Sequence, residues 1–263
     1  MDGSPAVMTA ASPASAAPVA LSVVIPMHNE AGNAGPLLAE VAATLAGRVA
    51  FEVVCVDDAS SDETLAELAA LAARLPELRV LRHARRSGQS AALRTGVKAA
   101  RAPWIATLDG DGQNDPADLL GLLARRDQSG DRVHLFAGWR QQRRDSRVKR
   151  VSSRIANGVR RGLLHDQCPD TGCALKLYRR DSYLDLPWFD HMHRYLPALF
   201  RRAGWEVETV PVGHRPRLAG RSKYGIGNRL WVGIVDLLGV AWLMRRSPLT
   251  AVQEVTPVDR RPQ

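Results

Sequence analysis

Cysteine is scarce in this chain, and its spacing argues against two kinds of protein. The 263 residues contain three cysteines, Cys55, Cys168 and Cys173, an odd number without the paired spacing of a zinc site. A disulfide framework is therefore disfavoured, and a reduced, cytosolic compartment is predicted. Cys55 lies in an apolar run and is most simply a small core residue.

Long uncharged apolar runs are also missing. No stretch of about 18 such residues occurs, so no segment clearly spans a bilayer. Residues 1–20 are rich in Ala, Ser and Pro but lack the basic start and apolar centre of a signal peptide, which favours a disordered tail, and 247–263 look like a second tail. We expect one large domain over 21–214 and a basic loop with an amphipathic helix over 215–246.

The nucleotide-binding motifs of two common folds are absent as well. No Gly-x-Gly-x-x-Gly follows the first apolar run, and no Walker lysine loop occurs. What is present is a regular alternation of apolar strands and helices, which predicts an α/β fold with a mostly parallel sheet covered by helices on both faces. The predicted strands are 21–26, 51–56, 78–82, 104–108, 133–137 and 174–178, and the predicted helices are one from about 33, then 64–75, 88–100 and 117–126.

Oxygen-bearing side chains follow the central predicted strand. The apolar run from Trp104 ends in Asp109, and Asp111 and Gln113 come within the next four residues. Carboxylate and amide oxygens suit Mg²⁺ or Mn²⁺, and Gly110 beside them leaves room for a nucleotide diphosphate. Asp-x-Asp is common by chance, and acids before a proline often form a solvated turn. Its place at the carboxyl end of a buried strand favours a ligand site.

Other strand ends carry polar residues too. His28 and Glu30 follow the first strand. The carboxylate of Glu30 could accept hydrogen bonds from a nucleotide base or from a ribose hydroxyl. Alternatively, Glu30 could belong to an ordinary helix start. Asp57 and Asp58 end the second strand, and two acids exceed what a helix cap needs. Asp58 is therefore a candidate for nucleotide contact, and Asp170, in a later turn, for contact with a sugar.

The charge is uneven along the chain. Residues 1–130 carry a net charge of −4 and residues 131–263 a net charge of +13, so the basic half should meet an anion. Arg140, at a predicted strand end, could reach a phosphate, whereas a solvated helix face explains many of the cations that follow it. His191 and His193 lie two residues apart, and we favour a structural role because no third metal ligand of that kind is near.

The run from Ile226 to Met244 predicts an amphipathic helix. At about 100° per residue, one face carries Trp231, Val235, Leu238 and Trp242, and Asp236 points away from it. Two tryptophans on one face describe a helix in the headgroup region of a membrane. Packing on its own domain or on a membrane subunit is the rival interpretation.

Four motifs together resemble glycosyltransferase family 2, and within it the dolichyl- or polyprenyl-phosphate sugar synthases. They are Pro26-x-x-Asn29-Glu30, Asp57-Asp58-x-Ser60-x-Asp62, Asp109-Gly110-Asp111-Gly112-Gln113 and Arg217-x-x-Gly220-x-Ser222-Lys223. The resemblance covers about 21–244 and implies the nucleotide-sugar transferase fold called GT-A, a Rossmann-like sheet. It implies that Pro26, His28, Glu30, Asp58 and Asp109 hold the nucleotide, that Asp111 and Gln113, with Asp109, bind Mg²⁺ or Mn²⁺, and that Arg140, Arg217 and Lys223 contact phosphates.

The resemblance also implies an activity and a place for it. We expect inverting transfer of a hexosyl group from a UDP- or GDP-linked sugar to a polyprenyl phosphate, with Asp109, Asp111 and Arg140 in catalytic positions. The enzyme should lie peripherally on the cytoplasmic face of the cell membrane. Many bacterial relatives carry two further membrane helices that this chain lacks, so an integral membrane partner is possible. His28 replaces a frequent aromatic and Gly110 a frequent alanine, which puts guanine and mannose in doubt.

Two alternatives remain open from the residues. A family 2 enzyme could act on another glycan or lipid acceptor. A non-enzymatic nucleic-acid-binding protein would use the basic half, but the aromatic platforms expected for single strands do not interleave with its cations, so we expect no nucleic acid partner.

Overall fold

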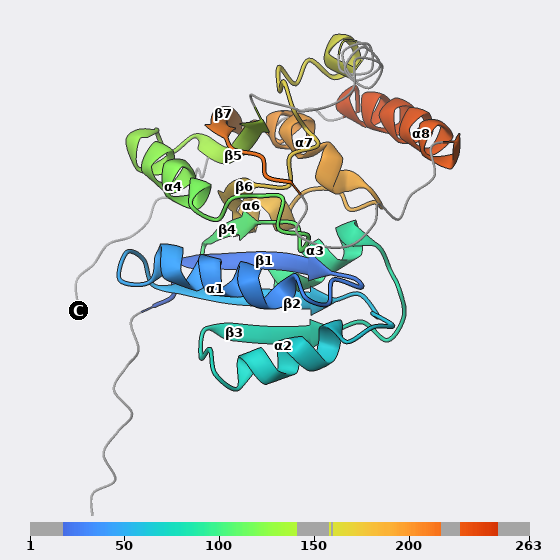
Figure 1. Ribbon diagram of the computed structural model, residues 1–263. Coiled ribbons are helices and arrows are strands. Elements are labelled where there is room, and N and C mark those ends of the chain that lie inside the picture. The colour runs from blue at the N-terminus through green and yellow to red at the C-terminus, as the bar shows by residue number, and fades with distance from the viewer. Residues whose placement is uncertain (1–17, 141–157, 159, 217–226, 247–263) are drawn as a thin grey trace, which may run out of the picture.

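A seven-stranded sheet with helices on both faces forms the protein (Figure 1). The computed structural model describes residues 18–140, 158, 160–216 and 227–246. Along the sheet the strands follow the order β3-β2-β1-β4-β6-β5-β7. The strands are β1 (Leu21–Met27), β2 (Phe51–Asp57), β3 (Leu78–Arg82), β4 (Trp104–Thr107), β5 (Val133–Arg140), β6 (Lys176–Arg179) and β7 (Glu206–Val212). The helices are α1 (Ala34–Leu45), α2 (Thr64–Ala72), α3 (Gln89–Ala99), α4 (Asp118–Gln128), α6 (Arg180–Leu184), α7 (Leu196–Arg202) and α8 (Gly227–Met244), with a 3-10 turn η1 (Met192–Arg194).

The strand directions confirm a mostly parallel sheet. Strands β1, β2, β3 and β4 pair in parallel, as do β5 and β7, whereas β6 runs antiparallel to both β4 and β5. The carboxyl ends of β1, β2, β4 and β5 therefore meet the beginning of β6 at one edge of the sheet. That edge is where open α/β sheets bind ligands.

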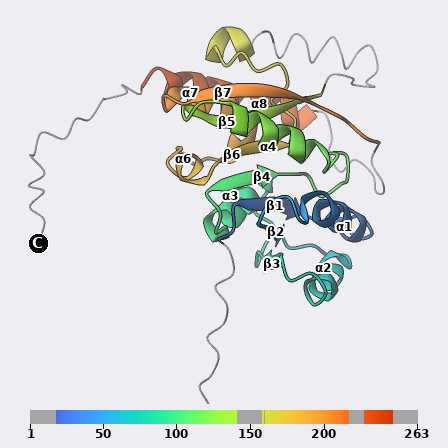
Figure 2. The same ribbon diagram turned by 90° about the vertical axis from the view of Figure 1, so that its left-hand side faces the viewer.

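Alternate residues of the central strands feed two separate cores. In β1, Val23 and Ile25 join the core under α1 and α4, while Val24 joins the core under α3, α6 and α7. Figure 2 shows this division, with α1 and α2 on one side of the sheet and α3 and α6 on the other. Burial on both faces explains the near-continuously apolar strands, since each buried Val or Ile side chain contributes about 1.5–3 kcal/mol.

The C-terminal helix α8 packs on α7 through one side only (Figure 1). Val240 and Ala241 on that side are buried, and Asp236 bonds to Nδ1 of His191 at 3.0 Å. The opposite side is the stripe predicted from the helical projection: Trp231, Val235, Leu238 and Trp242 are 71%, 65%, 59% and 59% exposed. Among the residues that the structure describes, no helix is both long enough and apolar enough to cross a bilayer.

Candidate active site

An open cleft of about 500 Å³ lies at the edge where the strand ends meet. Its walls come from segments far apart in the sequence: the ends of β1 and β2, the beginning of α3, the turn after β4, the end of β5, the segment before β6, and η1. The described residues of the predicted site all line it: Pro26, His28, Glu30, Asp58, Asp109, Gly110, Asp111, Gln113 and Arg140. Arg217 and Lys223 lie outside the described residues.

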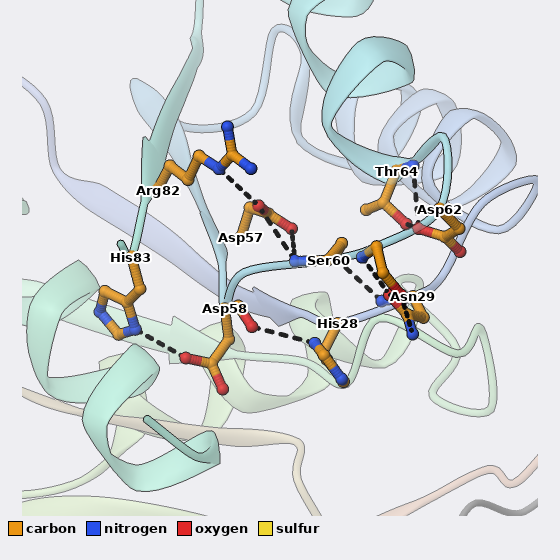
Figure 3. Close-up of polar contacts among 10 residues, drawn as sticks. His28, Asn29, Asp57, Asp58, Ser60, Asp62, Thr64, Arg82 and His83 are labelled. Carbon is orange, nitrogen blue, oxygen red and sulfur yellow. Dashed lines mark hydrogen bonds and ion pairs between the residues drawn. The ribbon is translucent and has the colours of Figure 1, made fainter. Parts of the chain in front are cut away.

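Two turns that follow β1 and β2 hold each other at one end of the cleft (Figure 3). The Nδ1 atom of His28 lies 2.9 Å from the carbonyl oxygen of Asp58. Because a carbonyl oxygen only accepts, Nδ1 carries the ring proton. The side chain of Asn29, whose φ is 52°, accepts a hydrogen bond from the backbone N–H of Ser61 at 2.8 Å. Asparagine tolerates this left-handed conformation, so the local sequence suits the sharp turn after β1.

The carboxylate of Asp58 organises the loop that leads into α3. It accepts hydrogen bonds from the backbone N–H groups of Ser87 and Gly88, each at 2.8 Å, and lies 2.7 Å from Nδ1 of His83. Burial alone would raise the pKa of Asp58, but these three donors hold it below the usual value. Both of its oxygens are used to fix Ser87 and Gly88 beside the cleft, and its contact with a nucleotide remains a prediction.

Two carboxylates share the centre of the cleft. Asp109 and Asp111 follow β4, and both line the cleft. Burial and the neighbouring Asp111 raise the pKa of Asp109 to about 6, against the attraction of Lys176 and Arg140. Two acids brought together in a partly desolvated place repel each other, and a divalent cation relieves that repulsion. The oxygen-rich donor set of Asp109, Asp111 and Gln113 therefore fits Mg²⁺ or Mn²⁺.

The structure gives a reason for glycine at position 110 that the sequence did not reveal. A Cβ atom added there would lie 2.4 Å from Sδ of Met27 and 3.1 Å from the carbonyl oxygen of Pro26. The turn after β4 thus touches the end of β1 directly. Glycine at this position is needed for close packing of the protein itself, whether or not a diphosphate also approaches.

Arg140, the one described cation among those assigned to phosphates, is paired with an acid. Arg140 donates from Nε and Nη2 to the carboxylate of Asp170, at 2.6 Å and 2.9 Å. Asp170 is buried, and its role here is to hold Arg140 at the cleft. Arg215, from the predicted basic loop, bridges Glu40 and Asp115, each at 2.6 Å. Its charge therefore ties the chain after β7 to α1 and to the turn before α4.

Three basic side chains on the wall of the cleft that β6 and η1 form were not predicted as site residues. They are Lys176 at the start of β6, and His193 and Arg194 in η1. The hydroxyl group of Ser90 lies 2.7 Å from Nδ1 of His193. Burial, together with Arg194, Lys176 and His191, lowers the pKa of His193 well below its usual value, so the ring is neutral at pH 7. Among the described residues, His191 and His193 do not act together: His191 meets α8, and His193 meets α3 and the cleft.

The assembled geometry favours chemistry on a polyanionic ligand. A cleft with a central carboxylate pair, suited to a divalent cation, is surrounded by Arg86, Arg140, Lys176 and Arg194. Electrostatic stabilisation of a departing diphosphate needs this combination of cation site and basic walls. Within the described residues no three His, Cys, Asp or Glu side chains converge, so an amide or ligand oxygen would have to complete the shell.

Comparison with known proteins agrees with the cleft chemistry. The family model described as glycosyl transferase family 2 matches residues 22–186. A dodecaprenyl-phosphate galacturonate synthase of Rhizobium johnstonii is 35% identical over 236 residues, covering 86% of this chain and 67% of its own length. An undecaprenyl-phosphate 4-deoxy-4-formamido-L-arabinose transferase of Edwardsiella ictaluri is 34% identical, covering 78% of this chain and 63% of its own length. The chain thus spans roughly two thirds of these curated relatives.

Solved structures share the fold at low sequence identity. Glucosyl-3-phosphoglycerate synthase of Mycobacterium tuberculosis, in complex with Mg²⁺ and UDP, superposes with a TM-score of 0.65 at 18% identity, covering 88% of this chain and 81% of the other. The mannosyltransferase PcManGT of Pyrobaculum calidifontis, in complex with GDP-Man and Mn²⁺, gives a TM-score of 0.63 at 20% identity, covering 91% and 70%. These likenesses confirm the predicted GT-A fold.

Proposed function

Because the chain belongs to glycosyl transferase family 2, a family of glycosyltransferases, we propose that it transfers a hexosyl group from a UDP- or GDP-linked sugar to a polyprenyl phosphate. The observation that carries this proposal is the carboxylate pair Asp109 and Asp111 at the centre of a cleft with basic walls. The names of the two curated relatives support the lipid acceptor, since both act on a polyprenyl phosphate. The names of these two relatives differ in the sugar that is transferred.

The proposed transfer needs no general base. An oxygen of the acceptor phosphate forms a bond to the anomeric carbon while the bond from that carbon to the donor diphosphate breaks, which inverts the configuration and releases the nucleoside diphosphate. A phosphate monoester has its second pKa near ~6 and is largely ionised at pH 7. The nucleophile therefore arrives already deprotonated.

Different residues of the cleft would bind the metal ion, the nucleoside and an anion. Asp109, Asp111 and Gln113 would hold Mg²⁺ or Mn²⁺, which supplies positive charge to the departing diphosphate. His28, Glu30 and Asp58 would bind the nucleoside end, as predicted. Arg140, fixed by Asp170, faces the centre and would hold an anion in place.

We further propose that α8 rests on the membrane surface that carries the lipid acceptor. Its stripe of Trp231, Val235, Leu238 and Trp242 is exposed, and two exposed arginines, Arg245 and Arg246, follow it, with the Arg246 guanidinium 5.4 Å from the centre of the Trp242 ring. An apolar stripe flanked by cations suits anionic headgroups, where each cation contributes about 1 kcal/mol. The protein would then be peripheral on the cytoplasmic face. An integral membrane partner stays a prediction from the resemblance alone.

A transfer assay tests the function. The full chain is incubated with a panel of UDP- and GDP-sugars and a polyprenyl phosphate, with and without Mn²⁺, and sugar entering the lipid phase is measured. Asp111→Asn should abolish transfer, while Asp127→Asn, which removes the same charge from an exposed position on α4, should not. Full activity of Asp111→Asn would refute the metal assignment, and no transfer from any donor by the unmodified chain would refute the function.

A further inference from the structure

Lys176 is a buried cation that has no acidic partner within the described part of the chain. Its side chain is on the cleft wall, yet the residue is only 4% exposed. Nζ donates to the carbonyl oxygens of Cys173 and, at 3.4 Å, of Thr171, which are neutral groups. Among the residues that the structure describes, no carboxylate lies within ion-pair distance of it. Burial accordingly lowers the pKa of Lys176, although Asp109 and Asp170 oppose the shift from further away.

A second cation lies on the same wall. Arg194 lines the cleft from η1, and within the described part of the chain it makes no ion pair with an acid. Lys176 and Arg194 both lower the pKa of His193, and all three residues line the same cleft. Arg140, by contrast, is neutralised by Asp170. A buried charge without a counterion is costly, so an anion bound here would be held strongly.

The order of the strands says which part of a donor reaches this wall. The predicted nucleoside residues are at the ends of β1 and β2, the carboxylate pair follows β4, and Lys176 begins β6, the next strand along. A nucleotide sugar laid across these ends with its diphosphate at Asp109 and Asp111 places its sugar at β6. Lys176 therefore faces the sugar, and Arg194 lines the same cleft from η1.

His193 would add a neutral donor beside them. The hydroxyl group of Ser90 lies 2.7 Å from Nδ1 of His193, and in the tautomer in which this hydroxyl donates to Nδ1 the ring proton is on Nε2. A hydrogen bond from a neutral imidazole suits a sugar hydroxyl, and the two cations suit something charged.

We propose that this wall recognises a carboxylate on the transferred sugar, so that the donor is a nucleotide-linked hexuronic acid. This inference rests on the proposed function. The carboxylate of a hexuronic acid carries one negative charge and is small enough to reach the buried ammonium group of Lys176, with Arg194 completing the contact. The phosphate of the acceptor and the diphosphate of the donor are the other anions for this wall. The acceptor phosphate arrives on a lipid from outside, whereas Lys176 is set into the wall of the donor cleft. The diphosphate is common to acidic and neutral donors, so its contact with Lys176 would give no preference between them.

Binding and kinetics of Lys176→Gln test the inference. Binding to the full chain with Mn²⁺ is measured for UDP-glucuronate and UDP-galacturonate against UDP-glucose and UDP-galactose. The unmodified chain should prefer an acidic donor by about 10- to 100-fold, the range for a hydrogen bond to a charged group. Lys176→Gln should remove that preference, and Arg194→Gln should reduce it. Lys98→Gln, the same charge change at an exposed position on α3, should keep it.

The outcomes separate the possibilities. A higher KM for polyprenyl phosphate in Lys176→Gln, with the donor preference kept, would place the acceptor phosphate at this wall and overturn the inference. An equal loss of binding for acidic and neutral donors, or a preference of the unmodified chain for neutral sugars, would also overturn it and leave the proposed function standing. Thermal unfolding checks the fold, and Lys176→Gln should unfold no earlier than the unmodified chain, because a buried unpaired cation is removed.

Discussion

Asp109→Asn should make the metal-free protein more stable at neutral pH. The pKa of this carboxyl rises from 3.8 to about 6 on folding, because of burial and the neighbouring Asp111. Each pKa unit corresponds to about 1.4 kcal/mol, so the ionised group costs the folded state at most about 3 kcal/mol. Water in the cleft screens part of this. Asparagine keeps the size of the side chain and can still accept the hydrogen bond that Gln89 donates at 2.7 Å.

The effect should depend on pH in a defined direction. Above about pH 6 the carboxyl is ionised in both states and the full cost is present. As the pH falls from about 6 towards 4, the folded state takes up a proton first and the cost disappears. The stability advantage of Asp109→Asn over the unmodified chain should therefore be largest at pH 7 and vanish near pH 4. Urea unfolding of both proteins across this range measures it.

A bound metal should largely close this difference in stability. Mn²⁺ with UDP at about 100 times its Kd stabilises a protein that binds it by about 2.7 kcal/mol. The unmodified chain should gain this increment, and Asp109→Asn should lose most of it. Below about pH 6 the increment should also shrink for the unmodified chain, since a proton competes with the metal. Equal stability of the two proteins without metal at pH 7, together with an undiminished Mn²⁺ increment in the variant, would refute this account of the carboxylate pair.

Three further perturbations test the packing, the buried network and α8. Gly96→Ala should destabilise the protein by about 1–3 kcal/mol in thermal unfolding, because the added Cβ would lie 2.4 Å from Cγ1 of Val24 and push α3 off the sheet. Glu52→Gln should cost about 1–3 kcal/mol at pH 7, since this buried carboxylate accepts three hydrogen bonds that keep its pKa low despite burial. That difference should fade as the pH falls below 4.5, the ordinary pKa of a glutamate side chain, and a constant difference would count against a role for the charge. Trp231→Ser with Leu238→Ser should weaken sedimentation with anionic vesicles by at least about tenfold and leave unfolding unchanged; unaltered sedimentation would exclude the stripe as the membrane contact.

The sheet was predictable because its central strands are buried on both faces. Apolar runs such as Val53–Val56 between two amphipathic helices leave few other interpretations, and the order of strand and helix then implies parallel pairing. The chain after α4 carried weaker signals. Strand β7 was not predicted, since Glu206, Glu208 and Pro211 interrupt its apolar residues. It is an edge strand, where proline and charge are tolerated. The antiparallel direction of β6 depends on a long connection that local patterns do not describe.

Part of the site was likewise predictable from the sequence and part was not. Asp109, Asp111 and Gln113 lie in one short turn at the end of a buried strand, so their spacing and their place together predict a shared ligand. Lys176 and Arg194 come together with them only because β6 inserts beside β4 and η1 packs against α3. Nothing in the local sequence separates a lysine in a strand from an ordinary edge residue. The residues that would hold the leaving group can thus be predicted from their local sequence. The residues that would select the sugar come together only through tertiary contacts. Enzymes that share the first group of residues can for this reason differ in the sugar they transfer, and the wall at β6 is where that difference should be sought.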